Sequence, residues 1–286
     1  MNNTDESLSL IAEGVGVGIP VSTEWAPMAS CDSLILVGLT GVGKSTVLAL
    51  LAVQLPDATI LPDRREITDR LMIPFVQRQN GRPIVPVTDR AERFDATRQY
   101  REQFPGGMAH ALSALAMSPA VASGLLIFDG LRGENEIRHA AASLPNARFL
   151  MLDAPDAVRI RRLVGRQESF DRLVTASPLE KIQDDGTLSL AAMGVSDLES
   201  ILALDQQQEI LRWVQEGQVS ADELAAKAHI IIAERRNYDP MATREALSAY
   251  AGDRSLVVDT ASSKPEEIAD DAVAWLRDTS LRRSLG

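Results

Sequence analysis

The chain has 286 residues, 45% of them hydrophobic, so it can bury one substantial core with a smaller appended unit. Its formal net charge of -11 argues against a general binder of nucleic acid or anionic membranes. Its single cysteine, Cys31, excludes an intramolecular disulfide framework. We find no signal-peptide pattern, and no apolar run approaches the length that a membrane helix needs, about 20 residues. We therefore expect a soluble, cytoplasmic protein that does not bind membranes.

Short apolar runs alternate with helical patterns along most of the chain. The apolar runs predict buried strands, and apolar residues that recur every three or four positions predict helices. The predicted strands, in chain order, are DSLILVG, DATILPD, LLIFDG, ARFLMLDAP, HIIIAE and SLVVDT. The predicted helices include KSTVLALLAVQLP, TDRAERFDATRQYREQF with Thr88 as its cap, MAHALSALAMSPAVASG, GENEIRHAAASLP and SSKPEEIADDAVAWLRD.

Strands that alternate with helices are typical of an α/β fold, in which helices cover both faces of a parallel sheet. The chain divides into four parts on this pattern. We expect a loose extension at 1–31, a core at 32–166, a polar helical insertion at 167–228, and strands with a closing helix at 229–286 that complete the core.

A glycine-rich loop follows the first predicted strand. GLTGVGKS has the spacing G-x-x-x-x-G-K-[ST] between a strand and a helix, which is the context that a phosphate-binding loop (P-loop) requires. Its N–H groups can point inward, Lys44 can reach the β- and γ-phosphates, and the Ser45 hydroxyl can bind Mg²⁺. The predicted nucleotide-binding residues are Gly38, Leu39, Thr40, Gly41, Val42, Gly43, Lys44, Ser45 and Thr46. The loop alone leaves a motor, a GTP switch and a transferase open.

The strand LLIFDG brings an acid, Asp129, to the carboxyl edge of the sheet, where such sheets bind ligands. Asp129 could hold Mg²⁺ or act on an incoming hydroxyl group; a simple turn cap is the alternative. Gly130 stands where many ATPase motors have a glutamate, and the guanine-reading N-K-x-D pattern of GTP switches does not occur. Both observations favour a transferase.

A short basic helix follows ARFLMLDAP. Arg162 and Arg166 share one face of it and could stabilise a transferring phosphoryl group, whereas a solvated basic helix is the alternative. Here the chain resembles the P-loop nucleoside and nucleotide kinases, the adenylate, guanylate and shikimate kinase group, whose lid arginines stand at matching positions. The Asp129–Gly130 pair and the closing VVDT and PEEIADDAVAWL also resemble that group.

The resemblance implies a P-loop NTPase three-layer sandwich with a mostly parallel central sheet, in which 167–228 is a helical lid-like insertion. That segment is longer than a simple lid. The implied catalytic residues are Lys44, Asp129, Arg162 and Arg166, with Ser45 and Asp129 as metal ligands. In this family the acceptor lies after the second strand, so the substrate-binding candidates are Asp63, Arg64, Arg65 and Arg132, with surface ion pairing as the alternative.

We therefore expect a kinase that uses ATP and Mg²⁺ to phosphorylate a small molecule or a mononucleotide. The alternative is a nucleotide-binding regulatory or assembly ATPase whose helical insertion binds a protein partner. The acidic balance disfavours a polynucleotide kinase. The acceptor, the preference for ATP over GTP and the oligomeric state stay open.

Overall fold

A parallel sheet forms the centre of the molecule. The computed structural model describes residues 8–18, 23–164 and 188–284. Its larger sheet has five parallel strands in the order β5-β7-β4-β8-β9. The strands are β4 (Ser33–Val37), β5 (Thr59–Ile60), β7 (Leu126–Leu131), β8 (Ala147–Asp153) and β9 (Ser255–Asp259).

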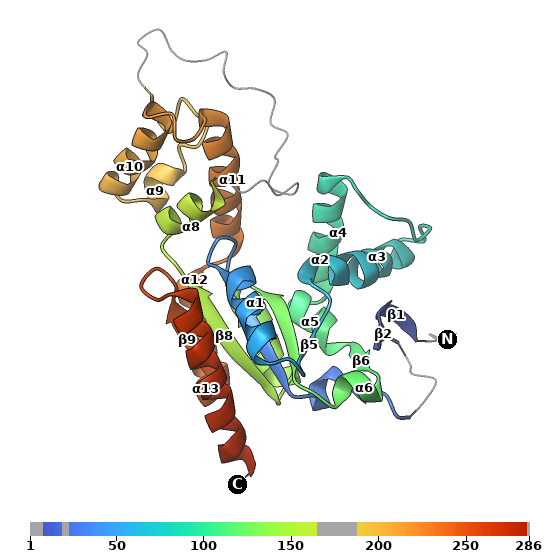
Figure 1. The fold of residues 1–286 in the computed structure, drawn as a ribbon. Coiled ribbons are helices and arrows are strands. Elements are labelled where there is room, and N and C mark those ends of the chain that lie inside the picture. The colour runs from blue at the N-terminus through green and yellow to red at the C-terminus, as the bar shows by residue number, and fades with distance from the viewer. Residues whose placement is uncertain (1–7, 19–22, 165–187, 285–286) are drawn as a thin grey trace.

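Alternate residues of β4 pack into two different apolar cores. Leu34 and Leu36 lie in the core that contains α1 and α13. Ile35 and Val37 lie in the core on the other face, with α5 and α7. The bounds are α1 (Lys44–Gln54), α5 (Met108–Ser113), α7 (Glu134–Ser143), α12 (Pro240–Ala246) and α13 (Pro265–Ser284). The predicted three-layer α/β fold is confirmed, and burial on both faces explains the unbroken apolar runs (Figure 1).

The N-terminal part adds a small antiparallel sheet of order β1-β2-β6-β3. The predicted long helix in MAHALSALAMSPAVASG is wrong, because its middle forms β6, which pairs with Val15–Val17. A partner strand about one hundred residues away overrides local helical propensity. The elements here are β1 (Ser9–Ala12), β2 (Val15–Val17), β3 (Ala26–Pro27), η1 (Met28–Ser30), β6 (Leu115–Met117) and α6 (Pro119–Ala122).

A group of helices between β5 and β6 stands on one side of the P-loop. It contains α2 (Arg64–Ile67), η2 (Thr68–Met72), α3 (Ile73–Gln79) and α4 (Arg90–Gln103). The cap of α4 is Asp89 and not the predicted Thr88. The Asp89 carboxylate accepts the Glu92 N–H at 2.8 Å, which satisfies one of the free donors of the first turn.

A helical unit with its own apolar core stands on the other side of the P-loop (Figure 1). Its helices are α8 (Asp156–Leu163), α9 (Leu198–Ile201), α10 (Leu204–Gln215) and α11 (Ala221–Asn237). The strand predicted for HIIIAE is wrong, because this run lies inside α11, which Ser220 caps and whose Ile231 is buried in the core of the unit. A short apolar run does not distinguish strand from helix by periodicity. Helix α11 also crosses position 228/229, where the sequence places a boundary.

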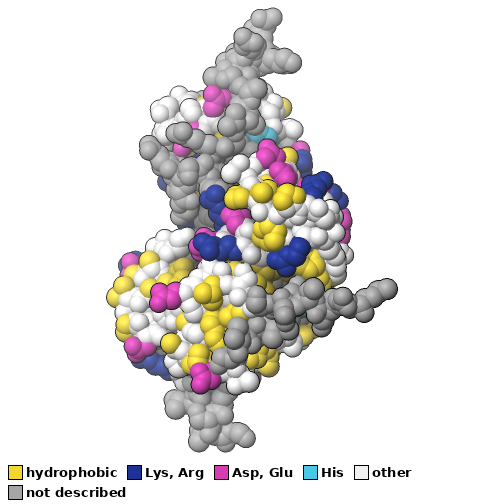
Figure 2. All heavy atoms as spheres, turned by 90° about the vertical axis from the view of Figure 1, so that its right-hand side faces the viewer, with side chains coloured by type: hydrophobic (Ala, Val, Ile, Leu, Met, Phe, Trp, Pro, Cys, Tyr) yellow, Lys and Arg dark blue, Asp and Glu magenta, His cyan; other side chains and the backbone are white. Residues whose placement is uncertain are grey.

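The remaining elements are η4 (Leu247–Ala251) and η5 (Gly252–Arg254), which lead into β9. Among the described residues, every helix is too short or too polar to traverse a lipid bilayer. On the face that Figure 2 shows, basic and acidic side chains lie beside one another, with hydrophobic side chains grouped between them. The described part of that face therefore presents no continuous basic surface.

Candidate active site

The P-loop leaves the carboxyl end of β4 along a path that requires glycine. Gly38 has φ of 146°, and a Cβ atom there would lie 2.4 Å from the Leu152 carbonyl oxygen. Gly41 has φ of 85°, and a Cβ atom there would lie 3.0 Å from the Arg159 carbonyl oxygen. Both positions combine a left-handed backbone with a close backbone neighbour, so any side chain would displace the loop.

Lys44 and Asp129 face each other at the base of the loop. The Lys44 ammonium donates hydrogen bonds to the carbonyl oxygens of Gly38 at 2.9 Å and Leu39 at 3.2 Å, and it lies 3.9 Å from Asp129 Oδ1. Burial lowers the pKa of Lys44 and raises the pKa of Asp129, while the opposite charge of each partly offsets the shift of the other. Asp129 Oδ1 is buried and accepts no hydrogen bond from the described residues.

Ser45 and Asp129 line the same cavity, about 530 Å³ in volume, beside the P-loop. A serine hydroxyl and a buried carboxylate oxygen without a donor are the hard oxygen ligands that Mg²⁺ takes, so these residues fit the predicted ion. The described residues hold no group of three or more His, Cys, Asp or Glu side chains that could bind a metal. A magnesium ion here would depend on phosphate oxygens and water for its other ligands, as Mg²⁺ at phosphate sites commonly does.

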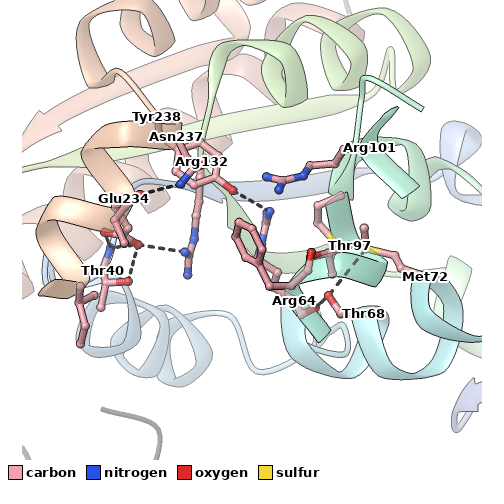
Figure 3. Close-up of a pocket in the computed structure, with 14 residues that line it drawn as sticks. Thr40, Arg64, Thr68, Met72, Thr97, Arg101, Arg132, Glu234, Asn237 and Tyr238 are labelled. Atoms are coloured by element: carbon pink, nitrogen blue, oxygen red, sulfur yellow. Dashed lines mark hydrogen bonds and ion pairs between the residues drawn. The ribbon is translucent and has the colours of Figure 1, made fainter. Parts of the chain in front are cut away.

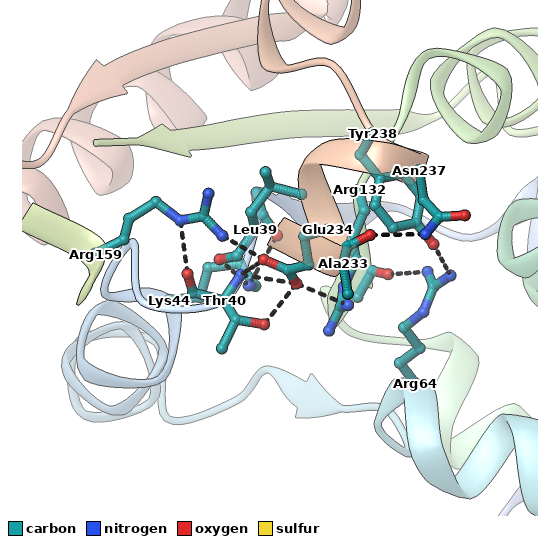
Figure 4. Close-up of polar contacts among 12 residues, drawn as sticks. Leu39, Thr40, Lys44, Arg64, Arg132, Arg159, Ala233, Glu234, Asn237 and Tyr238 are labelled. Atoms are coloured by element: carbon teal, nitrogen blue, oxygen red, sulfur yellow. Dashed lines mark hydrogen bonds and ion pairs between the residues drawn. The ribbon is translucent and has the colours of Figure 1, made fainter. Parts of the chain in front are cut away.

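A carboxylate from α11 reaches the rim of the P-loop (Figure 4). Glu234 accepts hydrogen bonds from the Thr40 N–H at 3.0 Å and from the Thr40 hydroxyl at 2.6 Å. It also forms ion pairs with Arg132, at 2.9 Å, and with Arg159. Burial opposes the ionisation of Glu234, but the two guanidinium groups and the Thr40 donors outweigh it and hold its pKa below the usual value.

Arg159 is a buried side chain of α8 that links the helical unit to the P-loop. Its guanidinium donates to the Thr40 carbonyl oxygen at 2.8 Å and to Asp156 at 2.6 Å, in addition to its pair with Glu234. The side chain of Arg159 is 1% exposed. Asp156 in turn binds Arg235 of α11 at 2.6 Å. A buried network of charged groups therefore connects α8, α11 and the P-loop.

A second cavity, of about 270 Å³, lies between the helical unit and the α2–α5 helices (Figure 3). It shares Thr40, Arg64, Thr68 and Arg132 with the P-loop cavity, so the two cavities have a common wall. Its remaining lining residues are Met72, Phe94, Thr97, Arg101, Met108, Ile230, Ala233, Glu234, Asn237 and Tyr238.

The three arginines of this second cavity differ in their partners. Arg64 binds Glu136 through two hydrogen bonds, at 2.7 and 2.9 Å, which raise its pKa despite its burial. Arg132 is paired with Glu234. Arg101, at the end of α4, points into the cavity and has no ion pair or hydrogen bond from its guanidinium to any described residue (Figure 3).

The predicted site residues are distributed as follows. The substrate-binding candidates Asp63, Arg64, Arg65 and Arg132 all line the P-loop cavity, together with Lys44, Ser45 and Asp129. Arg162 lines neither cavity; its guanidinium donates to the Val42 carbonyl oxygen at 3.2 Å and to Thr260 at 2.6 and 2.8 Å. Arg166 lies outside the described residues.

Arg101 and Glu234 are absent from the predicted site. Arg101 precedes the turn FPGG at the end of a polar helix, where an exposed arginine is ordinary. Glu234 ends the run HIIIAE, for which the sequence predicts a strand. In the structure it lies in the last turn of the long helix α11. A helical interpretation of 221–237 would have placed Glu234 on the same face as Ile231 and drawn attention to an acid beside buried residues.

Comparisons with known proteins find no matching family model and no matching curated protein. Among solved structures, a sugar kinase from a Janibacter species is 16% identical, with 86% of this chain and 95% of that chain covered and a TM-score of 0.33. A sulfotransferase from Alicyclobacillus acidocaldarius is 14% identical, with 86% and 80% covered and a TM-score of 0.34. Shikimate kinase from Aquifex aeolicus is 13% identical, with 87% and 98% covered and a TM-score of 0.30. Scores this low give no basis for a function.

Proposed function

We propose that the chain is a phosphotransferase that moves the γ-phosphoryl group of ATP, with Mg²⁺, to a small-molecule acceptor. The observation that carries the proposal is the pair of cavities with a common wall. The P-loop cavity has the cation and the oxygen ligands that a nucleotide needs, and the second cavity offers an acceptor a position beside it. A motor or a switch needs no second small-molecule cavity.

The roles follow from position. Lys44 neutralises the charge that develops on the transferring group, and the P-loop amides hold the phosphates. Ser45 and Asp129 would hold Mg²⁺, which supplies charge neutralisation across the β- and γ-phosphates. Arg132, at the common wall, lies where both substrates meet. The roles of Arg162 and Arg166 as clamps on the phosphoryl group remain part of this proposal.

The acceptor on this proposal is small and carries an acidic group. The volume of about 270 Å³ lies just below the roughly 300–1,000 Å³ typical of pockets for drug-sized ligands, which favours a compact metabolite over a mononucleotide. Arg101 supplies an arginine fork that pairs with none of the described residues, and such a fork binds a carboxylate or phosphate through two parallel hydrogen bonds. Thr97 and Tyr238 offer hydroxyl groups to the remaining polar atoms of the acceptor.

A screen of small carboxylic and phosphorylated hydroxy compounds tests the function. We expect one or more compounds to increase ADP release from ATP, and mass spectrometry to find the compound phosphorylated. Rapid ATP hydrolysis that no small molecule stimulates would contradict the proposal. Stimulation by a protein fraction alone would favour the regulatory ATPase, for which the helical unit with its separate core is the specific observation.

Arg101→Ala tests the acceptor site. We expect the KM for the acceptor found in the screen to rise about 10- to 100-fold, because one charge-assisted hydrogen-bonded pair is lost. The KM for ATP should change little. Arg98→Ala is the control, since Arg98 lies one turn away on α4, is about half exposed and pairs with Asp95 and Glu102. An unchanged acceptor KM in Arg101→Ala would exclude Arg101 as the anchor.

A further inference from the structure

Glu234 occupies an unusual position for an acid. It lies in the last turn of α11, where the helix dipole disfavours a negative charge by about 0.3–1 kcal/mol. It is 6% exposed, and buried carboxylates are costly unless they are fully paired. The contacts that hold its charge come from outside the helix, from the P-loop, Arg132 and Arg159.

The contacts of the Glu234 carboxylate are of the kind that hold a phosphate group in a P-loop. Both carboxylate oxygens accept from the rim of the cradle: Oε2 from the Thr40 N–H, and Oε1 from the Thr40 hydroxyl. Arg132 adds a guanidinium to Oε1, and Arg159 adds one to Oε2. A backbone amide of a P-loop together with two arginines is a typical oxyanion site. Here the oxyanion belongs to the protein.

We propose that Glu234 is a resident anion at the rim of the P-loop, and that the terminal phosphate of the donor nucleotide displaces it from Thr40. The inference rests on the proposed function, because it takes a nucleoside triphosphate as the ligand of the P-loop. Arg132, which lines both cavities and pairs with Glu234 before binding, becomes available to the phosphate after it. Arg159 lines neither cavity and keeps its bonds to Asp156 and to the Thr40 carbonyl oxygen.

Displacement also has a mechanical consequence. Glu234 links the P-loop to α11, and α11 packs into the core of the helical unit through Leu224, Ala228 and Ile231. When the carboxylate leaves Thr40, the end of α11 loses its hydrogen bonds to the P-loop. Binding of the donor is thereby coupled to the end of α11 that lines the acceptor cavity through Ala233, Asn237 and Tyr238. Occupation of one cavity alters a wall of the other.

Glu234→Gln tests the exchange, since glutamine keeps the shape and hydrogen-bonding capacity of the side chain but removes its charge. Titration calorimetry with ATP and Mg²⁺ should show affinity about tenfold tighter than in the unchanged protein, because no resident charge competes with the phosphate. The control is Asp222→Asn, which makes the same change of charge at an exposed position in the first turn of α11. It should leave ATP affinity unchanged. Equal or weaker ATP affinity in Glu234→Gln would overturn the proposal and leave Glu234 as a purely structural contact.

Hydrogen exchange on the unchanged protein gives a second measurement that does not depend on the folding of a variant. Saturating ATP with Mg²⁺ should speed exchange of the amides in 231–237, and ADP should do so less. Unchanged or slower exchange in 231–237 would contradict displacement. Failure of the proposed function looks different, since no small molecule would then be phosphorylated, whatever the ATP affinity of Glu234→Gln.

Discussion

Lys44→Ala is expected to lower the rate of phosphoryl transfer by about 10²- to 10³-fold, the cost of removing one preorganised group that stabilises transition-state charge. Lys44 lies at the base of the P-loop with its side chain 12% exposed, 3.9 Å from Asp129, and two loop carbonyl oxygens hold its ammonium in place. A cation fixed in a water-poor site needs no reorganisation as negative charge develops on the transferring group. ATP affinity should fall less than turnover, since the loop amides continue to bind the phosphates.

Single-turnover measurement of the phosphorylated acceptor separates this effect from product release. Lys264→Ala is the control, because it removes the same charge from an exposed lysine just before α13, away from both cavities. Thermal unfolding of both variants shows whether the fold is intact. A Lys44→Ala protein that transfers phosphate within tenfold of the unchanged rate would remove Lys44 from the catalytic group.

The parts of the fold that depend on local sequence were predictable. The spacing of its glycines identifies the P-loop in the sequence, and Gly38 and Gly41 lie where the backbone leaves no room for a Cβ atom. The central strands are apolar on both faces because Leu34 and Ile35 enter different cores. These signals are contained in runs of a few residues, so no knowledge of distant partners is needed to interpret them.

The rest depends on partners that are distant in the chain. Met117 belongs to a strand because Val15 and Ala26 pair with it. Arg64 and Arg101 are indistinguishable as residues, yet Glu136 binds the first and no described residue pairs with the second. Glu234 is 194 residues from Thr40. Which arginines are available to a substrate is therefore decided by tertiary contacts, and a single sequence does not contain that information.

Arg159→Ala is expected to lower the free energy of unfolding by about 3–5 kcal/mol, the usual cost of removing one member of a buried charged network. The Arg159 side chain is 1% exposed and bonds to Asp156, Glu234 and the Thr40 carbonyl oxygen. Without Arg159, the buried carboxylates of Asp156 and Glu234 each lose one cationic partner. Arg159→Lys keeps the charge but cannot span three acceptors with a single ammonium, so we expect an intermediate loss.

Urea unfolding of these variants measures the loss, with Arg161→Ala as the control two positions along α8. The Arg161 side chain is 72% exposed and lies 3.8 Å from Glu209, a surface pair worth less than about 1 kcal/mol. Equal losses in Arg159→Ala and Arg161→Ala would show that the network contributes nothing. A double-mutant cycle of Arg159→Ala with Glu234→Gln then isolates their coupling. Because Arg159 belongs to α8 and Glu234 to α11, strong coupling would mean that this buried ion pair stabilises the packing of the two helices beside the P-loop.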